Sequence, residues 1–140
     1  MDILDTLLIS ASGMTAQRVR LQAVASNMAN ARTTRSEEGG PYQRQMPVFK
    51  ANDVNRFGDM VERNLARVDV VDVVSDDDPG IRVHDPGHPD ADLEGYVLMP
   101  NVNILEEMVD MMTTSRTYEA NASVVETTFE MARNALELAR

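Results

Sequence analysis

The sequence predicts a mainly α-helical fold in which two long terminal helices flank a small β-rich insert. Residues 103–140 contain no Gly or Pro and carry apolar residues at seven-residue intervals, and residues 2–30 carry a second such row. The chain between them holds short alternating apolar runs separated by Pro, Gly and Asp. We therefore expect residues 1–31 and 101–140 to form a discontinuous coiled-coil domain, within and between molecules, and residues 32–100 to form a β-hairpin-rich insert.

The first predicted helix spans residues 2–30. Its apolar residues fall on one seven-residue row, namely Leu7, Met14, Leu21 and Met28. Many of its other residues are small, and Gly13 lowers helix propensity by about 1 kcal/mol relative to Ala. A helix of this kind is marginal alone, so we expect it to depend on packing against partners.

The insert begins after a polar break at 32–40 (RTTRSEEGG). Residues 42–50 are predicted to be extended, and Pro47 places them at a sheet edge because proline lacks a donor for the ladder. Residues 65–74 (LARVDVVDVV) alternate as a strand does, and residues 76–80 (DDDPG) form a strong turn signal. We expect residues 81–84 to return as the hairpin partner of 65–74, and residues 96–99 to be a short extended segment.

The second predicted helix begins after Asn103, a favourable N-cap. At 1.5 Å per residue it would be roughly 57 Å long, whereas a compact chain of this size has a radius of gyration of about 14 Å. Its apolar stripe therefore needs partners. The stripe consists of two rows: Met108, Ser115, Ala122, Phe129 and Leu136, and Ile104, Met111, Tyr118, Val125, Ala132 and Ala139.

The composition excludes several classes of protein. The net charge is −10 and no basic patch exists, which argues against binding to nucleic acid or to an anionic membrane surface. The chain has no cysteine, so disulfides and thiolate chemistry are absent. Asp2 and Asp5 stand where a secretory signal would be basic, and no apolar run is long enough to span a bilayer. We expect no cleaved signal peptide.

No catalytic constellation can be assembled from the sequence. His84 and His88 have metal-ligand spacing for a helix, but Pro86, Gly87 and Pro89 exclude a helix there, so a solvated turn is the better interpretation. The three aspartates at 76–78 lack the rest of a calcium loop. No serine lies in a nucleophile motif. We expect no enzymatic activity, no metal and no cofactor.

Two segments contain sequence motifs that resemble those of a known protein family, in addition to the heptad periodicity. Residues 25–30 (ASNMAN), followed by Thr33 and Thr34, resemble a signature of bacterial flagellar rod and hook proteins. A longer run resembles the short proximal-rod members of the flagellar basal-body rod family. It comprises HPDAD at 88–92, GYV at 95–97, MPNV at 99–102, EMV at 107–109 and SRTYEAN at 115–121, and the GGPY stretch at 39–42 agrees with it.

The resemblance implies a structural subunit of the proximal rod. Terminal helices of one copy would pair and pack against neighbours in a helical tube that encloses the export channel and transmits motor torque, with the insert outside. Implied partners are the other proximal and distal rod proteins, the export-gate adaptor and, during secretion, the type III export apparatus. The implied location is the basal body, in the periplasmic space, reached without a cleaved signal peptide. From the residues alone, a cytoplasmic coiled-coil adaptor or flagellar export chaperone remains the alternative.

We expect assembly contacts to involve residues of both helices. Asn27 and Asn30 lie where the first helix ends, and they either cap or bridge helix ends or belong to an ordinary polar face. The full expected set is Leu7, Met14, Leu21, Asn27, Met28, Asn30, Met108, Met111, Tyr118, Asn121, Val125, Phe129 and Leu136.

Overall fold

The computed structural model describes residues 3–36, 39–53 and 65–138. Its elements follow the predicted order of helix, insert and helix, which confirms the fold class. They are α1 (Ile3–Asn30), β1 (Gln45–Asp53), β2 (Ala66–Ser75), β3 (Ile81–His84), β4 (Tyr96–Met99) and α2 (Ile104–Leu138).

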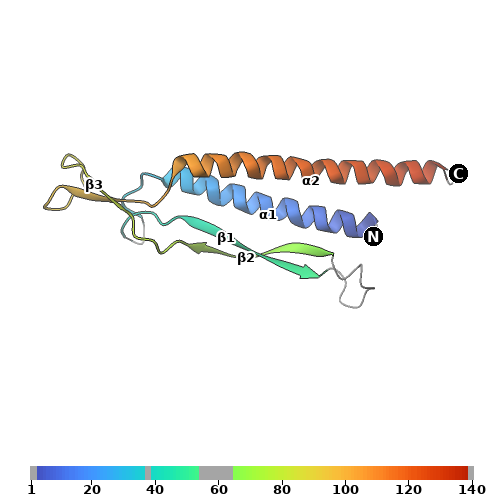
Figure 1. Cartoon of the computed structure of the whole chain (residues 1–140), viewed down its shortest axis with the longest axis horizontal. Helices are drawn as coiled ribbons and strands as arrows, with labels where there is room; N and C mark the ends of the chain where they lie inside the picture. The colour runs from blue at the N-terminus through green and yellow to red at the C-terminus, as the bar shows by residue number, and fades with distance from the viewer. Residues whose placement is uncertain (1–2, 37–38, 54–64, 139–140) are drawn as a thin grey trace.

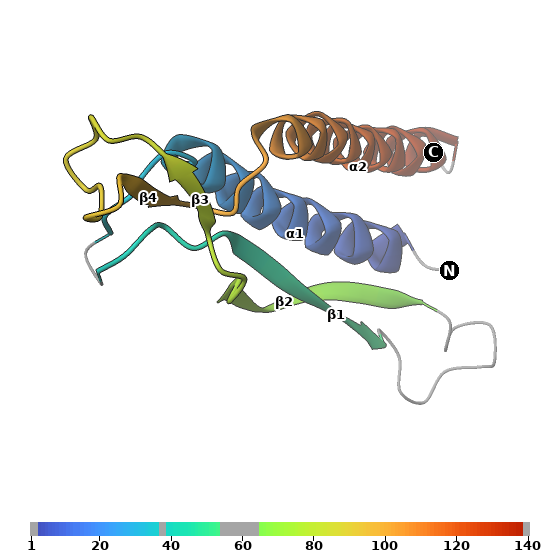
Figure 2. The same cartoon turned by 60° about the vertical axis from the view of Figure 1, so that its left-hand side comes forward.

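The molecule is elongated, with α1 as its middle layer. The helix α2 runs antiparallel to α1 along one side, and the β1–β2 ribbon packs along the other side (Figures 1 and 2). The β3–β4 hairpin lies at the end of the molecule where α1 ends and α2 begins. Helix α2 has 35 residues against 28 in α1, and it continues past the first described turn of α1 (Figure 1). Most α2 residues outside the seam with α1 are exposed.

The helix α1 packs closely because its buried residues are mostly small. Ala16, Ala23 and Val24, together with Val97 from β4, are the fully buried apolar residues of the described chain. On the α2 side, a Cβ added to Gly13 would lie 3.1 Å from the amide nitrogen of Asn121. The absence of a side chain at position 13 thus lets the two helices approach, which explains a glycine in the interior of a helix.

The strands β1 and β2 form an antiparallel two-stranded ribbon, so Pro47 lies on an edge strand as predicted. Val48 pairs with Asp72 and Phe49 with Val70, which leaves Val71 as the extra residue of a β-bulge. The connection between the strands falls on residues outside the described chain.

The predicted pairing of residues 81–84 with 65–74 is wrong. The β2 strand pairs with β1, and β3 pairs with β4 in a separate hairpin. The physical reason lies at residue 76, whose backbone N–H donates to the carbonyl of Arg44 at 2.8 Å and so continues the β1–β2 ladder. Chain reversal occurs later, where Asp92 accepts hydrogen bonds from the backbone N–H groups of Glu94 and Tyr96.

The start of α2 agrees with the sequence. The Asn103 side chain accepts a 3.1 Å hydrogen bond from the backbone N–H of Leu105, as an N-cap does. The rotation of the helix about its own axis agrees only in part. Met111, Val125 and Ala132 lie half-buried in the seam with α1, but Phe129 and Leu136 are exposed. The seam instead contains the row one residue earlier, namely Glu107, Thr114, Asn121 and Thr128.

Candidate assembly surface

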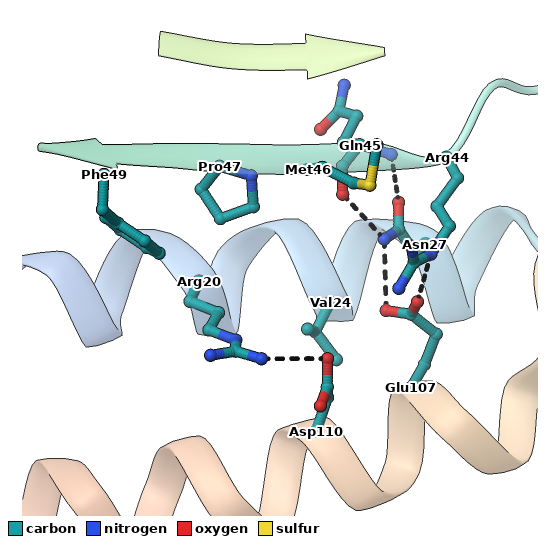
Figure 3. A pocket seen from close by; sticks show the side chains of 10 residues that line it. All are labelled: Arg20, Val24, Asn27, Arg44, Gln45, Met46, Pro47, Phe49, Glu107 and Asp110. Carbon is teal, nitrogen blue, oxygen red and sulfur yellow. Dashed lines mark hydrogen bonds and ion pairs between the residues drawn. The ribbon is translucent and has the colours of Figure 1, made fainter. Parts of the chain in front are cut away.

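A buried asparagine joins the three layers of the molecule. Asn27 is 1% exposed and uses its whole amide (Figure 3). Its Nδ2 donates to the Gln45 carbonyl at 3.0 Å and to Glu107 Oε2 at 3.1 Å. Its Oδ1 accepts from the Gln45 N–H at 2.8 Å and from the Tyr42 hydroxyl at 2.9 Å. By pairing with both backbone groups of Gln45, the amide takes the place of a neighbouring strand at the free edge of β1.

Glu107 is the second centre of this junction. Its side chain is 1% exposed, and Oε1 accepts a 2.6 Å hydrogen bond from Arg44 Nε. Burying a carboxylate is costly unless it is paired and hydrogen-bonded, and here both oxygens have donors. Arg44 comes from the segment before β1 and Asn27 from α1, so the carboxylate fixes the first turns of α2 against both.

A cavity of about 350 Å³ lies beside the junction, between α1, α2 and β1. One wall is apolar and is formed by Val24, Met46, Pro47 and Phe49 (Figure 3). Its charged residues are arranged as two ion pairs, because Arg20 contacts Asp110 at 3.2 Å as Arg44 contacts Glu107. The cavity therefore presents little unbalanced charge.

Asn30 has a more local role than Asn27. Its Nδ2 donates to the carbonyl of Ser26 at 3.0 Å, and its Oδ1 accepts from the Thr33 hydroxyl at 3.2 Å. The carbonyl of Asn30 also accepts from the backbone N–H of Thr33 at 2.9 Å. Of the roles expected for the two residues, Asn30 caps the end of α1 and Asn27 bridges it to β1 and α2.

The fully buried residues that α2 contributes to the intramolecular seam are polar, whereas its apolar seam residues Met111, Val125 and Ala132 are only half-buried. Glu107, Thr114 and Thr128 are buried on α2, opposite Ser10 and Asn27 among the buried residues of α1. Gln17 Oε1 and Thr114 Oγ1 are buried without a hydrogen-bond partner among the described residues. Such a seam gains less from the hydrophobic effect than an apolar one would, so the apolar side chains of α2 remain available for other contacts.

Large apolar side chains are exposed on both sides of this seam. Phe129 is 60% exposed and Met131 is 57% exposed. Contiguous exposed apolar surface on a folded chain usually marks an interaction site. The exposed large apolar residues of α2 are Ile104, Leu105, Met108, Val109, Met112, Tyr118, Val124, Phe129, Met131, Leu136 and Leu138.

The structure distributes the predicted interface residues over three environments. Asn27 is buried. The exposed members are Met108, Tyr118, Phe129 and Leu136, and the half-buried members are Leu7, Met14, Leu21, Met28, Asn30, Met111, Asn121 and Val125.

Sequence reasoning did not identify two groups of residues. The ion pair between Arg44 and Glu107 could not be predicted from neighbouring residues, because the two residues are distant in the sequence and only the fold brings them together. The polar row that contains Thr114 and Thr128 does have a seven-residue period, and this period could have indicated that the row, rather than its apolar neighbour, enters the seam.

The two histidines have ordinary structural contacts. The His84 ring packs edge-on against Tyr96 at 5.0 Å between centroids, and His88 Nδ1 accepts from the backbone N–H of Asp90 at 3.1 Å. Across the described ranges, no group of three or more potential metal ligands is gathered. Neither helix, over the part that is described, is both long and apolar enough to cross a membrane.

Comparisons with known proteins agree on one family. Residues 7–35 match the family model described as "Flagella basal body rod protein", and residues 93–138 match "Flagellar basal body rod FlgEFG protein C-terminal". These ranges lie in the two terminal regions of the chain and include the predicted row of the first helix and, apart from Ala139, both predicted rows of the second.

Full-length relatives extend the match through the insert. The "Flagellar basal-body rod protein FlgC" of Aquifex aeolicus is 42% identical over 98% of this chain and 97% of the relative. The proteins of the same name from Bacillus subtilis and Borreliella burgdorferi are 38% and 37% identical, covering 100% and 99% of this chain and 100% and 98% of the relatives. The chain belongs to the FlgC family of flagellar basal-body rod proteins.

Proposed function

We propose that this chain builds the wall of the proximal rod through the apolar side chains that its own fold leaves exposed. Family membership makes the chain a structural subunit of the flagellar basal-body rod, rather than a cytoplasmic adaptor or export chaperone. The observation that carries the proposal is the exposure of Phe129, Met131, Leu136 and Leu138 on a helix whose main packing partner, among the described elements, is α1. In this arrangement the helices form the inner tube, and the insert forms the outer shell.

We further propose that the subunit works mechanically, without catalysis, metal or cofactor. Its terminal helices would pack with those of other rod proteins, in a heterologous contact that continues as a helical array and encloses the export channel. Torque would pass through these contacts. The proposed partners are the other proximal and distal rod proteins and the export-gate adaptor. The polar junction around Asn27 and Glu107 supports this role because it ties the tube-forming helices to the outer ribbon.

We also propose that the chain crosses the inner membrane through the type III export apparatus and assembles in the periplasmic space without N-terminal cleavage. Membership of the flagellar basal-body rod family supports this route.

A deletion strain complemented with an epitope-tagged chain tests the function. We expect the deletion to abolish swimming and rod completion, and the tagged chain to restore both and to co-purify with hook–basal bodies. The N-terminus of the recovered chain should begin at Met1 or Asp2. A strain that swims without the chain, or a tagged chain that restores swimming yet stays in the cytoplasm, would overturn the proposal.

A further inference from the structure

Two apolar rows run along α2 on opposite sides of its seam with α1. The row one position after the buried Glu107 row is called here the Phe129 row, and it consists of Met108, Ser115, Ala122, Phe129 and Leu136. The row three positions after the Glu107 row is called the Met131 row, and it consists of Asp110, Thr117, Val124, Met131 and Leu138. In a coiled-coil helix these offsets turn the rows to opposite sides of the buried row.

The two rows have matching apolar residues in the second half of α2. Ala122, Phe129 and Leu136 each lie two residues, or about 3 Å along the axis, before a residue of the other row. Two α2 helices side by side and in the same direction, displaced by that distance, would pair Phe129 with Met131. The same displacement pairs a small residue with a larger one at Ala122 and Val124, and two leucines at Leu136 and Leu138. Thioether–aromatic contacts such as Phe with Met are favourable.

The residues next to the two rows differ in charge. Beyond the Phe129 row lie Met112, Glu119, Glu126 and Arg133, whereas the positions beyond the Met131 row carry Thr113, Ala120, Thr127 and Asn134. Two parallel copies that joined through their Phe129 rows would place Glu119 and Glu126 of each copy beside the mostly apolar Met111 row of the other, which is unfavourable for a carboxylate. Joining unlike rows places the carboxylates beside neutral polar groups instead.

We infer that a second copy of this chain docks on α2, with the Phe129 row of one copy packed against the Met131 row of the next. The contact joins two different surfaces, so each copy keeps one row free for a further copy, and association continues beyond a dimer. The inference rests on the proposed rod assembly and deepens it, because it names the partner of this face and the direction of packing.

Disulfide cross-linking tests the contact cleanly because the chain has no cysteine of its own. The variant Phe129→Cys/Met131→Cys is expressed in the deletion strain, and hook–basal bodies are isolated and oxidised. Positions two apart on a helix point in different directions, so the pair cannot close within one chain. We expect a ladder of dimers, trimers and larger species from the double variant, and no ladder from either single variant.

The matched control is Ser123→Cys/Glu130→Cys, which lies on the exposed side of α2 away from both rows and should remain monomeric. A single variant that stops at dimers would show packing through like rows and overturn the inference. Monomers only, or adducts with the mass of another protein, would overturn it while leaving the proposed function intact, provided that the chain is present in the basal bodies. If the Phe129→Cys/Met131→Cys chain is not incorporated into basal bodies, the Leu136→Cys/Leu138→Cys variant tests the same contact one heptad later.

Discussion

The side chain of Asn27 acts as a missing strand for Gln45, donating to its carbonyl at 3.0 Å and accepting from its N–H at 2.8 Å. One residue thereby orders the free edge of β1 and, through Glu107, the beginning of α2. The ASNMAN motif at 25–30 thus has a structural explanation, because an amide is the side chain that can donate and accept at the same position.

Removal of this amide should destabilise the fold. Asn27→Ala leaves the backbone of Gln45 and one Glu107 oxygen without their buried partner, at an expected cost on the order of 3 kcal/mol. Urea unfolding of the purified chain, followed by circular dichroism, measures the loss. Asn30→Ala is the control, because its hydrogen bonds are local, and it should cost about 1 kcal/mol or less. Equal losses in the two variants would contradict the bridging role of Asn27.

The two ion pairs beside the cavity should differ in importance. Arg44→Met leaves the carboxylate of Glu107 buried without its cation, and breaking a buried pair in this way typically costs about 3–5 kcal/mol. Arg20→Met breaks a pair whose side chains are 39% and 37% exposed, so its cost should be below about 1 kcal/mol. Urea midpoints of the two variants decide the order, and a larger loss for Arg20→Met would reverse our interpretation of the junction.

Gly13 and Asn121 should be energetically coupled. Gly13→Ala raises helix propensity by about 1 kcal/mol, but the new methyl group would lie 3.1 Å from Asn121 Nδ2. We therefore expect Gly13→Ala to gain little or lose stability in the natural chain, and to stabilise the Asn121→Ala variant by about 1 kcal/mol. A double-mutant cycle on unfolding free energies measures the coupling. A coupling energy of zero would show that the helices do not meet at this point.

Phe129→Asp should separate folding from assembly. Because Phe129 is 60% exposed in the single chain, its replacement should change the free energy of unfolding by no more than about 0.5 kcal/mol. A charge in an assembled apolar contact is much more costly, so swimming and rod completion should be lost. Soft-agar motility and electron microscopy of basal bodies measure the outcome. The control strain carries Ser123→Asp, which lies on the side of α2 that faces away from the seam, and it should still swim. Normal swimming by the Phe129→Asp strain would exclude the row that contains Phe129 from assembly.

The β3–β4 hairpin should loosen in acid. The backbone N–H of Tyr96, together with that of Glu94 and the guanidinium of Arg82, lowers the pKa of Asp92 below its ordinary value of 3.8. A lowered pKa means that the carboxylate stabilises the hairpin above pH 3.8 and that this contribution is lost as the pH falls through the lower value in the folded chain. NMR titration and amide exchange at Tyr96 should show the loosening. Asp92→Asn keeps an acceptor oxygen but cannot titrate, so its exchange should lack this step.

Local signals in the sequence were enough to predict the elements. The heptad rows predicted both helices, Asn103 predicted the start of α2, and Pro47 predicted an edge strand. Two features could not be predicted because they depend on residues that are distant in the sequence. The rotation of α2 is fixed by Asn27 and Arg44, which hold Glu107 inward. The partner of β3 is decided by the backbone of residue 76, which extends the ladder of an earlier strand.

The polar seam has a consequence for stiffness. Two helices joined by a uniform apolar stripe can slide by small steps at little cost. In this seam, the hydrogen-bonded amide of Asn27 and the methyl-sized gap at Gly13 each fit at one axial position only. In a rotating shaft, load arrives as shear between neighbouring helices. In a subunit with such a seam, α1 and α2 resist sliding along each other under load. Twist applied at one end of the shaft would therefore reach the other end with little delay.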